Sequence, residues 1–412
     1  MHIVVNGWFW GQMNTGSGQY LHGLARHLPA VGAAHRFTMV LPAVNSSTAP
    51  AGWQVEVAPP AAQPLGANLA KLWFEQMTFP RACQRLNADI AFTPYWGSPW
   101  RRPCPTAVTV HDVIPLLLPA YRGGVLQRAY TWLVSQTAGR ADLVLTDSQA
   151  SRQDIVQHLG IPAERVQAVL LAAGNHYRPV TDPGQLARVR ERYGLPQRFI
   201  LYLGGFDVRK NVAGLVRAYA RCAQPETSFF LENDVSGSPR LPDMSFSREN
   251  DMSESPRPSD KSFFGKNDLS QSPHLVIAGK LPTADTPFTP DPRRIAAEAG
   301  VADRVHFTGW VDEADKPALY SLASLFVFPS LYEGYGLPVA EAAACGAPIV
   351  TSNRSSLPEV APTALLVDPE DTEALAAAMA QALAAPRPPS PAQRRTWSDV
   401  ARDTLTFLEE LP

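Results

Sequence analysis

The stretch LFVFPSLYEGYGLPVAEAAACG, residues 325–346, decides the fold of the second half of this chain. Its first four residues are apolar, which predicts a short strand buried on both faces of a parallel sheet. Pro338 suits the first turn of a helix, which places Glu341 in that turn and Glu333 in the loop before it. Without their neighbours, the two glutamates would more often have ordinary structural roles: Glu333 would be a solvated side chain, and Glu341 would interact with the helix dipole. The surrounding glycines and proline favour a ligand site, because ligands bind at the carboxyl ends of parallel strands.

Similar apolar runs recur along the chain and predict the remaining strands. They lie at residues 106–110, 142–145, 199–203, 275–278, 325–328 and 348–350, and helical periods such as 212–219 and 375–382 lie among them. Strands that alternate with helices predict an α/β fold with mostly parallel sheets. Residues 174–179, which begin with glycine and end with proline, separate two series of alternating strands and helices. We therefore expect two doubly wound, Rossmann-like domains, at residues 1–178 and 179–390, that face a cleft.

Length and charge exclude several classes of protein. The 412 residues suffice for two or three domains, and 36 basic against 38 acidic side chains leave no overall positive field for nucleic acid. Four cysteines form no Cys-x-x-Cys pair, so we expect no disulfide framework and no structural metal site. No apolar run approaches the ~18 residues of a membrane span, and the start lacks a signal-peptide pattern. We expect a protein of the cytoplasm, either free or attached peripherally at the inner face of the membrane.

Residues 228–273 break the alternation of strands and helices. Three copies of a serine-rich motif begin at Ser228, Ser245 and Ser262, 17 residues apart, and each copy carries one or two phenylalanines. The units of a solenoid need an apolar face on which to stack, and these copies have almost none. The repeats therefore predict a flexible insert within the second domain rather than a binding array.

Two basic residues follow the buried strand at 199–203. Gly204 and Gly205 end this strand, and Arg209 and Lys210 stand just before a predicted helix that begins at 211. Two cations beside the free backbone N–H groups of a helix N-terminus can bind an anion such as a phosphate. An ordinary solvated loop is the alternative, and the position after a buried strand favours the anion site. The chain has no Asp-x-Asp pair, so we expect no metal there.

Candidate residues of the first domain follow other predicted strands. His111 comes directly after the strand at 106–110 and should face the cleft, although a satisfied structural histidine is the alternative. Gly16, Ser17 and Gly18 precede a helical run at 20–28, and their backbone N–H groups could approach a phosphate or an acceptor. A plain strand-to-helix turn explains these three residues almost as well. They lack the third glycine of a dinucleotide fingerprint, which disfavours an oxidoreductase.

The stretch from Phe328 to Leu357 resembles the Glu-x7-Glu signature of the retaining GT-B glycosyltransferases of family four, also called glycosyl transferases group one. Glu333 and Glu341 fit the spacing of that signature. The resemblance covers nearly the whole chain except the insert. Segments similar to the family's phosphate-site and donor-domain patterns lie at 203–211, 305–310 and 352–360, and those similar to its acceptor-domain patterns lie at 16–18, 109–112 and 141–148.

This resemblance implies a nucleotide diphosphate sugar as donor substrate, bound in the second domain, and no cofactor. Glu341 would contact the ribose and Glu333 the donor sugar, and His111 would reach the donor sugar or the acceptor across the cleft. Many relatives carry an arginine at or beside the position of Gly205, so either Arg209 replaces that contact or it only flanks Lys210. A C-terminal helix within 391–412 would cross back onto the first domain. The expected catalytic residues are Glu333, Lys210, Arg209 and His111, and the expected donor-binding residues are Glu341, Gly204, Gly205, Gly336, Leu337 and Pro338.

Three functions are compatible with these patterns. The leading hypothesis is a metal-independent retaining glycosyltransferase that moves a hexose to a glycan or lipid-linked acceptor in cell-surface polysaccharide biosynthesis. From the resemblance, mannose from GDP-mannose is the first choice. A nucleotide-sugar 2-epimerase, which also begins by breaking the sugar–phosphate bond, is the alternative enzyme, and the Glu333 to Glu341 spacing favours the transferase. A non-catalytic scaffold of a glycan pathway is the third hypothesis, suggested by the repeats of the insert.

Overall fold

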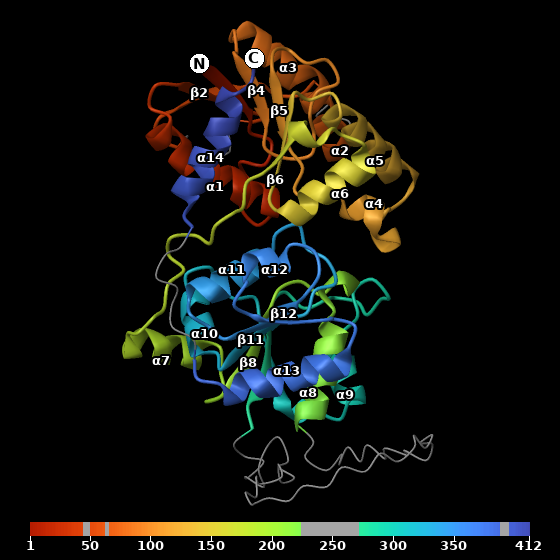
Figure 1. The fold of residues 1–412 in the computed structure, drawn as a ribbon, viewed down its shortest axis with the longest axis vertical. Coiled ribbons are helices and arrows are strands. Elements are labelled where there is room, and N and C mark those ends of the chain that lie inside the picture. Colours follow the sequence, from red (N-terminus) through yellow and green to blue (C-terminus); the bar gives the residue numbers. More distant parts are fainter. Residues whose placement is uncertain (44–49, 62–65, 224–271, 388–394) are drawn as a thin grey trace, which may run out of the picture.

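The computed structural model describes residues 1–43, 50–61, 66–223, 272–387 and 395–412. Two bodies, each built on one parallel sheet with helices packed against it, lie next to one another in Figure 1. The predicted α/β class with two doubly wound halves is therefore confirmed. The predicted insert at 228–273 lies outside the described residues, except for Ser272 and Pro273.

The first sheet has seven strands, all paired in parallel. Its order is β3 (Trp53–Val57), β2 (Arg36–Leu41), β1 (His2–Asn6), β4 (Ile90–Thr93), β5 (Thr106–Thr109), β6 (Leu143–Thr146) and β7 (Val166–Ala168). The direction of the strand order reverses between β1 and β4. Such a reversal opens a crevice beyond the carboxyl ends of the strands, where doubly wound sheets bind ligands.

The second sheet has six strands, also all parallel. Its order is β10 (Val305–Gly309), β9 (His274–Ala278), β8 (Phe199–Leu203), β11 (Leu325–Phe328), β12 (Ile349–Ser352) and β13 (Leu365–Val367). Its reversal lies between β8 and β11, the strands that precede the two basic residues and the two glutamates. The six apolar runs predicted as strands are β5, β6, β8, β9, β11 and β12, with ends that differ by a residue or two.

Helices connect the strands and complete both cores. The helices of the first half are α1 (Gly16–Val31), α2 (Ala67–Trp73), α3 (Phe79–Arg85), α4 (Ile114–Leu117), α5 (Val125–Ala138) and α6 (Gln149–Leu159). Those of the second half are α7 (Pro183–Arg192), α8 (Val212–Ala223), α9 (Pro292–Glu298), α10 (Lys316–Leu322), α11 (Leu337–Ala344), α12 (Leu357–Val360), α13 (Thr372–Ala384) and α14 (Trp397–Glu409). In Figure 1, α11 and α12 lie at the edge of the second body that faces the first.

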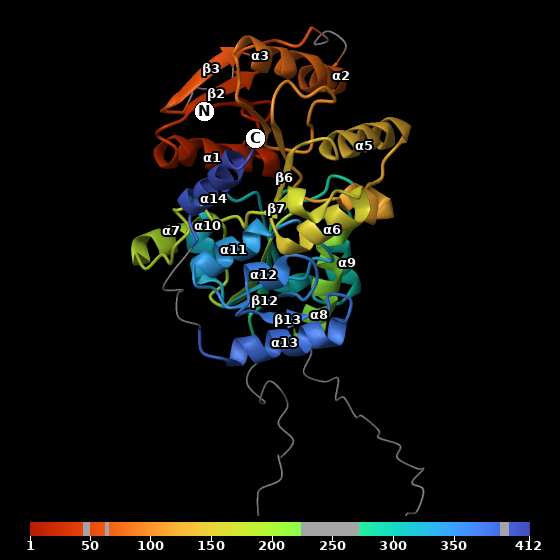
Figure 2. The same cartoon turned by 45° about the horizontal axis from the view of Figure 1, so that its top comes forward.

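The last helix, α14, returns to the first domain and lies beside α1 (Figures 1 and 2). Its residues Val400, Ala401, Leu405 and Leu408 are buried in the core of that domain, together with Trp397. This confirms the predicted crossing. The two helices approach closely at Gly23 of α1, where an added Cβ atom would lie 2.4 Å from the indole ring of Trp397.

Replacing Gly23 with alanine should therefore lower the free energy of unfolding by about 1–3 kcal/mol, the usual cost of an extra methyl group in a packed interior. Denaturant unfolding measures this loss. Gly184→Ala in α7 is the matched control, since its Cβ atom would have no neighbour closer than 3.5 Å, and it should keep or raise the stability. Deletion of residues 393–412 should destabilise the protein more than Gly23→Ala does. Unfolding curves that match those of the wild type for both changes would show that α14 does not hold the first domain.

Candidate active site

A cleft of ≈ 500 Å³ lies between the two domains. Most of its walls come from the start of α1 and from the segments that follow β5, β6, β8 and β11, at the carboxyl ends of the two sheets, and Lys316 of α10 and Trp397 of α14 also line it. Gly18, Gly204 and Gly205 are not among the residues that line it. The predicted site residues that do line it are Gly16, Ser17, His111, Arg209, Lys210, Glu333, Gly336, Leu337, Pro338 and Glu341.

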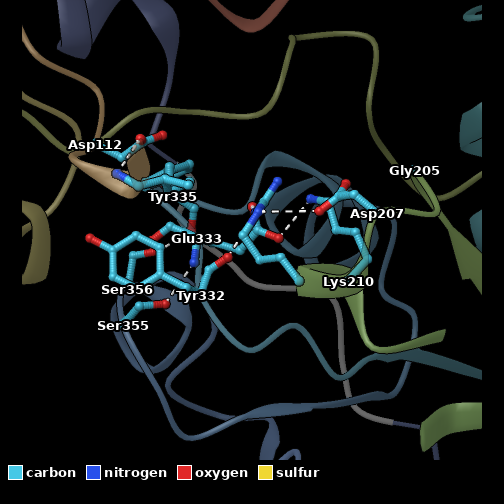
Figure 3. Close-up of polar contacts among 12 residues, drawn as sticks. Asp112, Gly205, Asp207, Lys210, Tyr332, Glu333, Tyr335, Ser355 and Ser356 are labelled. Atoms are coloured by element: carbon cyan, nitrogen blue, oxygen red, sulfur yellow. Dashed lines mark hydrogen bonds and ion pairs between the residues drawn. The ribbon is translucent and has the colours of Figure 1, made fainter. Parts of the chain in front are cut away.

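Glu333 is the charged centre of the cleft. Lys210 donates to its Oε1 atom at 2.6 Å (Figure 3). The Nη1 atom of Arg209 lies 2.8 Å from its Oε2 atom. The three side chains are only 9–13% exposed. Burial alone would raise the pKa of Glu333, but Lys210 and Arg209 outweigh it and hold the pKa below its usual value. The site thus holds one ionised carboxylate between two cations.

The loop that carries Glu333 is fixed by the segment after β12. The backbone N–H of Glu333 donates to Ser355 Oγ at 2.9 Å, and Ser356 Oγ donates to the carbonyl oxygen of Glu333 at 3.0 Å (Figure 3). Gly336 is the N-cap residue directly before α11 and has φ +105°, and an added Cβ atom there would lie 2.6 Å from Leu357. Only glycine tolerates this backbone conformation without strain, so the residue fixes where the helix starts.

Glu341 stands one turn further along its helix than the sequence predicts. Because α11 begins at Leu337, Glu341 is its fifth residue and not part of the first turn, which corrects the prediction. Tyr320 donates to its Oε2 atom at 2.9 Å. Burial raises the pKa of Glu341 to about 7, and the nearby charge of Lys316 offsets part of that effect. Near neutral pH this carboxyl group is therefore partly protonated.

His111 stands on the opposite wall, after β5. Its Nδ1 atom lies 2.8 Å from Asp147 Oδ2, and 21% of its side chain is exposed. Burial would lower the pKa of His111, but Asp147 outweighs burial and raises it. The Asp147 pair thus favours a positively charged imidazolium at the first-domain wall. This placement agrees with the predicted position of His111 at the cleft.

Residues 16–18 form the first turn of α1 and not a loop before it, which corrects the prediction. Thr15 is the residue that caps this helix, and its Oγ1 atom accepts from the Gly18 N–H at 3.1 Å. An added Cβ atom on Gly18 would lie 2.0 Å from the carbonyl oxygen of Gln12. Gly18 is therefore required by close packing of the preceding loop, while Gly16 and Ser17 face the cleft.

The glutamate loop also contacts the first domain directly. Ser148 Oγ and Ser151 Oγ donate to the carbonyl oxygen of Gly334 at 2.8 and 3.1 Å. The carboxylate of Glu359 accepts from two backbone N–H groups at the start of α6, each at 2.8 Å. The position of Glu333 in the cleft therefore depends on both domains.

No pattern in the sequence predicts two of the residues near Glu341. Lys316 lines the cleft, and Tyr320 of α10 donates to Glu341 from behind the lining. Asp147 also lines the cleft and lies in the predicted acceptor-domain segment 141–148. Within the described ranges, no group of three or more His, Cys, Asp or Glu side chains is placed to hold a metal ion. Among the described helices, none has the length and apolar character needed to cross a membrane.

Two family models match the chain, one in each half. Residues 14–170 match the model described as Glycosyltransferase Family 4, and residues 266–385 match the one described as Glycosyl transferases group 1. O-antigen chain mannosyltransferase B of Escherichia coli is 30% identical over 296 residues, which are 71% of this chain and 62% of that relative. The serotype-specific mannosyltransferase WbdA of Escherichia coli is 29% identical over 265 residues, 64% of this chain and 26% of WbdA. The match thus spans less than two thirds of either relative's own length.

A solved structure covers almost the whole chain. The Anabaena protein HepE, crystallised in complex with UDP and glucose, is 18% identical, superposes with a TM-score of 0.64 and covers 99% of both chains. At this identity the likeness shows the fold alone, and that fold is the predicted GT-B arrangement. The chain therefore contains a Glycosyltransferase Family 4 domain at residues 14–170 and a Glycosyl transferases group 1 domain at residues 266–385.

Proposed function

We propose that the protein is a retaining, metal-independent glycosyltransferase that moves mannose from GDP-mannose to a glycan or lipid-linked acceptor of a cell-surface polysaccharide. The names of the two Escherichia coli relatives support mannose, and the O-antigen in one of them supports a polysaccharide product. The observation that carries the proposal is the ion-paired Glu333 with Lys210 and Arg209, in a cleft that also contains Glu341 and His111.

The two cations explain how the sugar–phosphate bond would break. As that bond breaks, negative charge gathers on the departing diphosphate, and Lys210 and Arg209 lie in the cleft where they can stabilise it. Both cations bind Glu333 in this structure, so an arriving diphosphate would compete for them. The carboxylate of Glu333 would then accept a hydrogen bond from a sugar hydroxyl. If Lys210 and Arg209 bind the diphosphate in this way, stabilisation of its charge requires no metal ion.

Glu341 would hold the ribose of the donor. A buried carboxylate that accepts from two neighbouring hydroxyl groups forms strong, charge-assisted hydrogen bonds. Only the ionised carboxylate accepts at both oxygen atoms, and with the pKa of Glu341 at about 7 the group is partly protonated at neutral pH. Binding of the nucleotide should therefore remove a proton from this side chain.

This gives a pH dependence with a definite sign. We expect the affinity for a nucleoside diphosphate to fall as the pH drops below about 7, because more of the protein then carries protonated Glu341. Calorimetry in two buffers of different ionisation enthalpy would measure the released proton. The phosphate groups also titrate, so Glu341→Gln serves as the control and should release fewer protons than the wild type. Equal proton release by both proteins would contradict this role.

A membrane location is proposed from the exposed face of α5. Val125, Leu126 and Trp132 are 74, 87 and 59% exposed, and the exposed Arg122 and Arg128 flank them. Apolar side chains among basic ones suit the surface of an anionic bilayer. The protein should sediment with vesicles that contain phosphatidylglycerol, and Leu126→Asp combined with Trp132→Asp should release it. Equal sedimentation of this variant would contradict the proposed surface.

The proposed function is tested with a panel of nucleotide sugars, including GDP-mannose and UDP-glucose, with and without EDTA. We expect transfer or slow hydrolysis of GDP-mannose and no loss of rate in EDTA. A donor isomerised at the sugar would instead support the 2-epimerase. A folded protein that turns over none of the donors would overturn the proposal and favour the scaffold.

A further inference from the structure

Tyr121 reaches from the first domain to the segment of the second domain that carries Arg209. It ends a short 3₁₀ helix, Pro119–Tyr121, between α4 and α5. Its hydroxyl group donates to Asp207 Oδ1, and its ring packs edge-on against Phe288, with ring centres 4.9 Å apart. Tyr121 and Asp207 are not among the residues that line the cleft, whereas Arg209 is. The contact therefore joins the two domains beside the cleft and not within it.

Asp207 lies between this hydroxyl group and a cation of the site. The Oδ1 atom that accepts from Tyr121 is 3.5 Å from the Nε atom of Arg209, which is too far for a good hydrogen bond. Among the described residues, none accepts a hydrogen bond from this buried Nε atom. The Nη1 atom of Arg209 instead lies 2.8 Å from Glu333 Oε2 and donates to the carbonyl oxygen of Tyr332 at 2.7 Å. Asp207 is thus close to Arg209 without a hydrogen bond to it.

This separation matters for an anion in the cleft. A carboxylate and a phosphate both accept from a guanidinium group, so an aspartate that pairs fully with Arg209 would compete with a phosphate for it. The Tyr121 hydroxyl group binds the oxygen atom of Asp207 that faces Arg209 and fixes the direction of that carboxylate. Burial, and after it the hydrogen bond to Asp207, raise the pKa of Tyr121 to about 12, so the hydroxyl group remains a donor near neutral pH.

We infer that Tyr121 is a positioning residue for the nucleotide site: by holding Asp207 from across the domain boundary, it prevents Asp207 from pairing with Arg209 and leaves that cation available to a diphosphate. Tyr121 acts through Asp207 and is not itself a catalytic residue. The inference rests on the proposed function for the diphosphate as the ligand of Arg209. It makes nucleotide affinity in the second domain depend on a side chain of the first.

Titration calorimetry of the full chain with GDP, and separately with UDP, tests this without any turnover. Tyr121→Phe keeps the ring on Phe288 and removes only the hydroxyl group. For the nucleotide that the wild type binds, this variant should bind about 3- to 10-fold more weakly, because Arg209 must first give up a charge-assisted pair with Asp207. Asp207→Asn removes the competing charge, so Tyr121→Phe should have almost no effect in that background.

Tyr193→Phe is the matched control. Tyr193 donates to Asp315 Oδ2 at 3.0 Å, and Arg192 pairs with the same atom at 2.7 Å. This is a second group of a tyrosine, an aspartate and an arginine, and it does not line the cleft, so Tyr193→Phe should bind nucleotide as the wild type does. Thermal midpoints show that the variants fold.

The two backgrounds separate the inference from a merely structural role. If the Tyr121 hydroxyl group only held the domains together, Tyr121→Phe would weaken binding equally with Asp207 and with Asn at position 207, and that result would overturn the inference. Wild-type affinity in Tyr121→Phe alone would overturn it as well, while leaving the proposed function intact. A wild-type protein that binds neither nucleotide would contradict the proposed function, and the inference would fail with it.

Discussion

The Lys210→Ala variant is expected to turn over its donor about 100- to 1,000-fold more slowly than the wild type, the usual loss when one group that stabilises developing charge is removed. Lys210 lies 2.6 Å from Glu333 in this structure, and its contact with the diphosphate should strengthen as the sugar departs. An interaction of this kind lowers kcat more than it raises KM. Steady-state hydrolysis of the donor measures both parameters.

Two further variants make this result specific. Lys210→Arg keeps the charge and should retain part of the lost rate. Arg354→Ala removes a cation of the same domain that pairs at the surface with Asp368 and Glu370, and it should leave the rate unchanged. A Lys210→Ala variant with wild-type kcat and a raised KM would place Lys210 in ground-state binding only.

The Glu341→Ala variant is expected to bind the free nucleoside diphosphate about 10- to 100-fold more weakly than the wild type, because a charge-assisted hydrogen bond to the ribose is lost. Titration calorimetry above the pKa of Glu341 measures the effect where the wild-type group is ionised. Glu373→Ala, at an exposed glutamate of α13 that pairs with Arg221 of α8, is the matched control. Unchanged affinity in Glu341→Ala would remove this residue from the nucleotide site.

The fold was predictable because its strands are short apolar runs buried on both faces. The runs at 199–203 and 325–328 are followed by short loops that carry Arg209 and Glu333, so strand position alone predicts that these residues share a sheet edge. The structure brings both side chains together within hydrogen-bonding distance. The local sequence pattern and the sheet topology together therefore predict that Arg209 and Glu333 meet in the cleft.

Other parts of the site depend on contacts that no local pattern encodes. Tyr320 comes from α10 and meets Glu341 only after the helices pack. Tyr121 and Asp207 belong to different domains and meet only across the boundary between them. The start of α1 could have been placed correctly, since Thr15 is a favoured N-cap residue directly before Gly16.

The stereochemistry of the transferred sugar tests the central claim most directly. The protein would be incubated with GDP-mannose, whose mannose is α-linked, and an acceptor glycoside, and the anomeric C–H coupling of the new linkage would be measured by NMR. A retaining glycosyltransferase gives an α-mannoside as the first product. A β-mannoside would contradict retention, and an isomerised GDP-sugar without transfer would contradict the transferase itself.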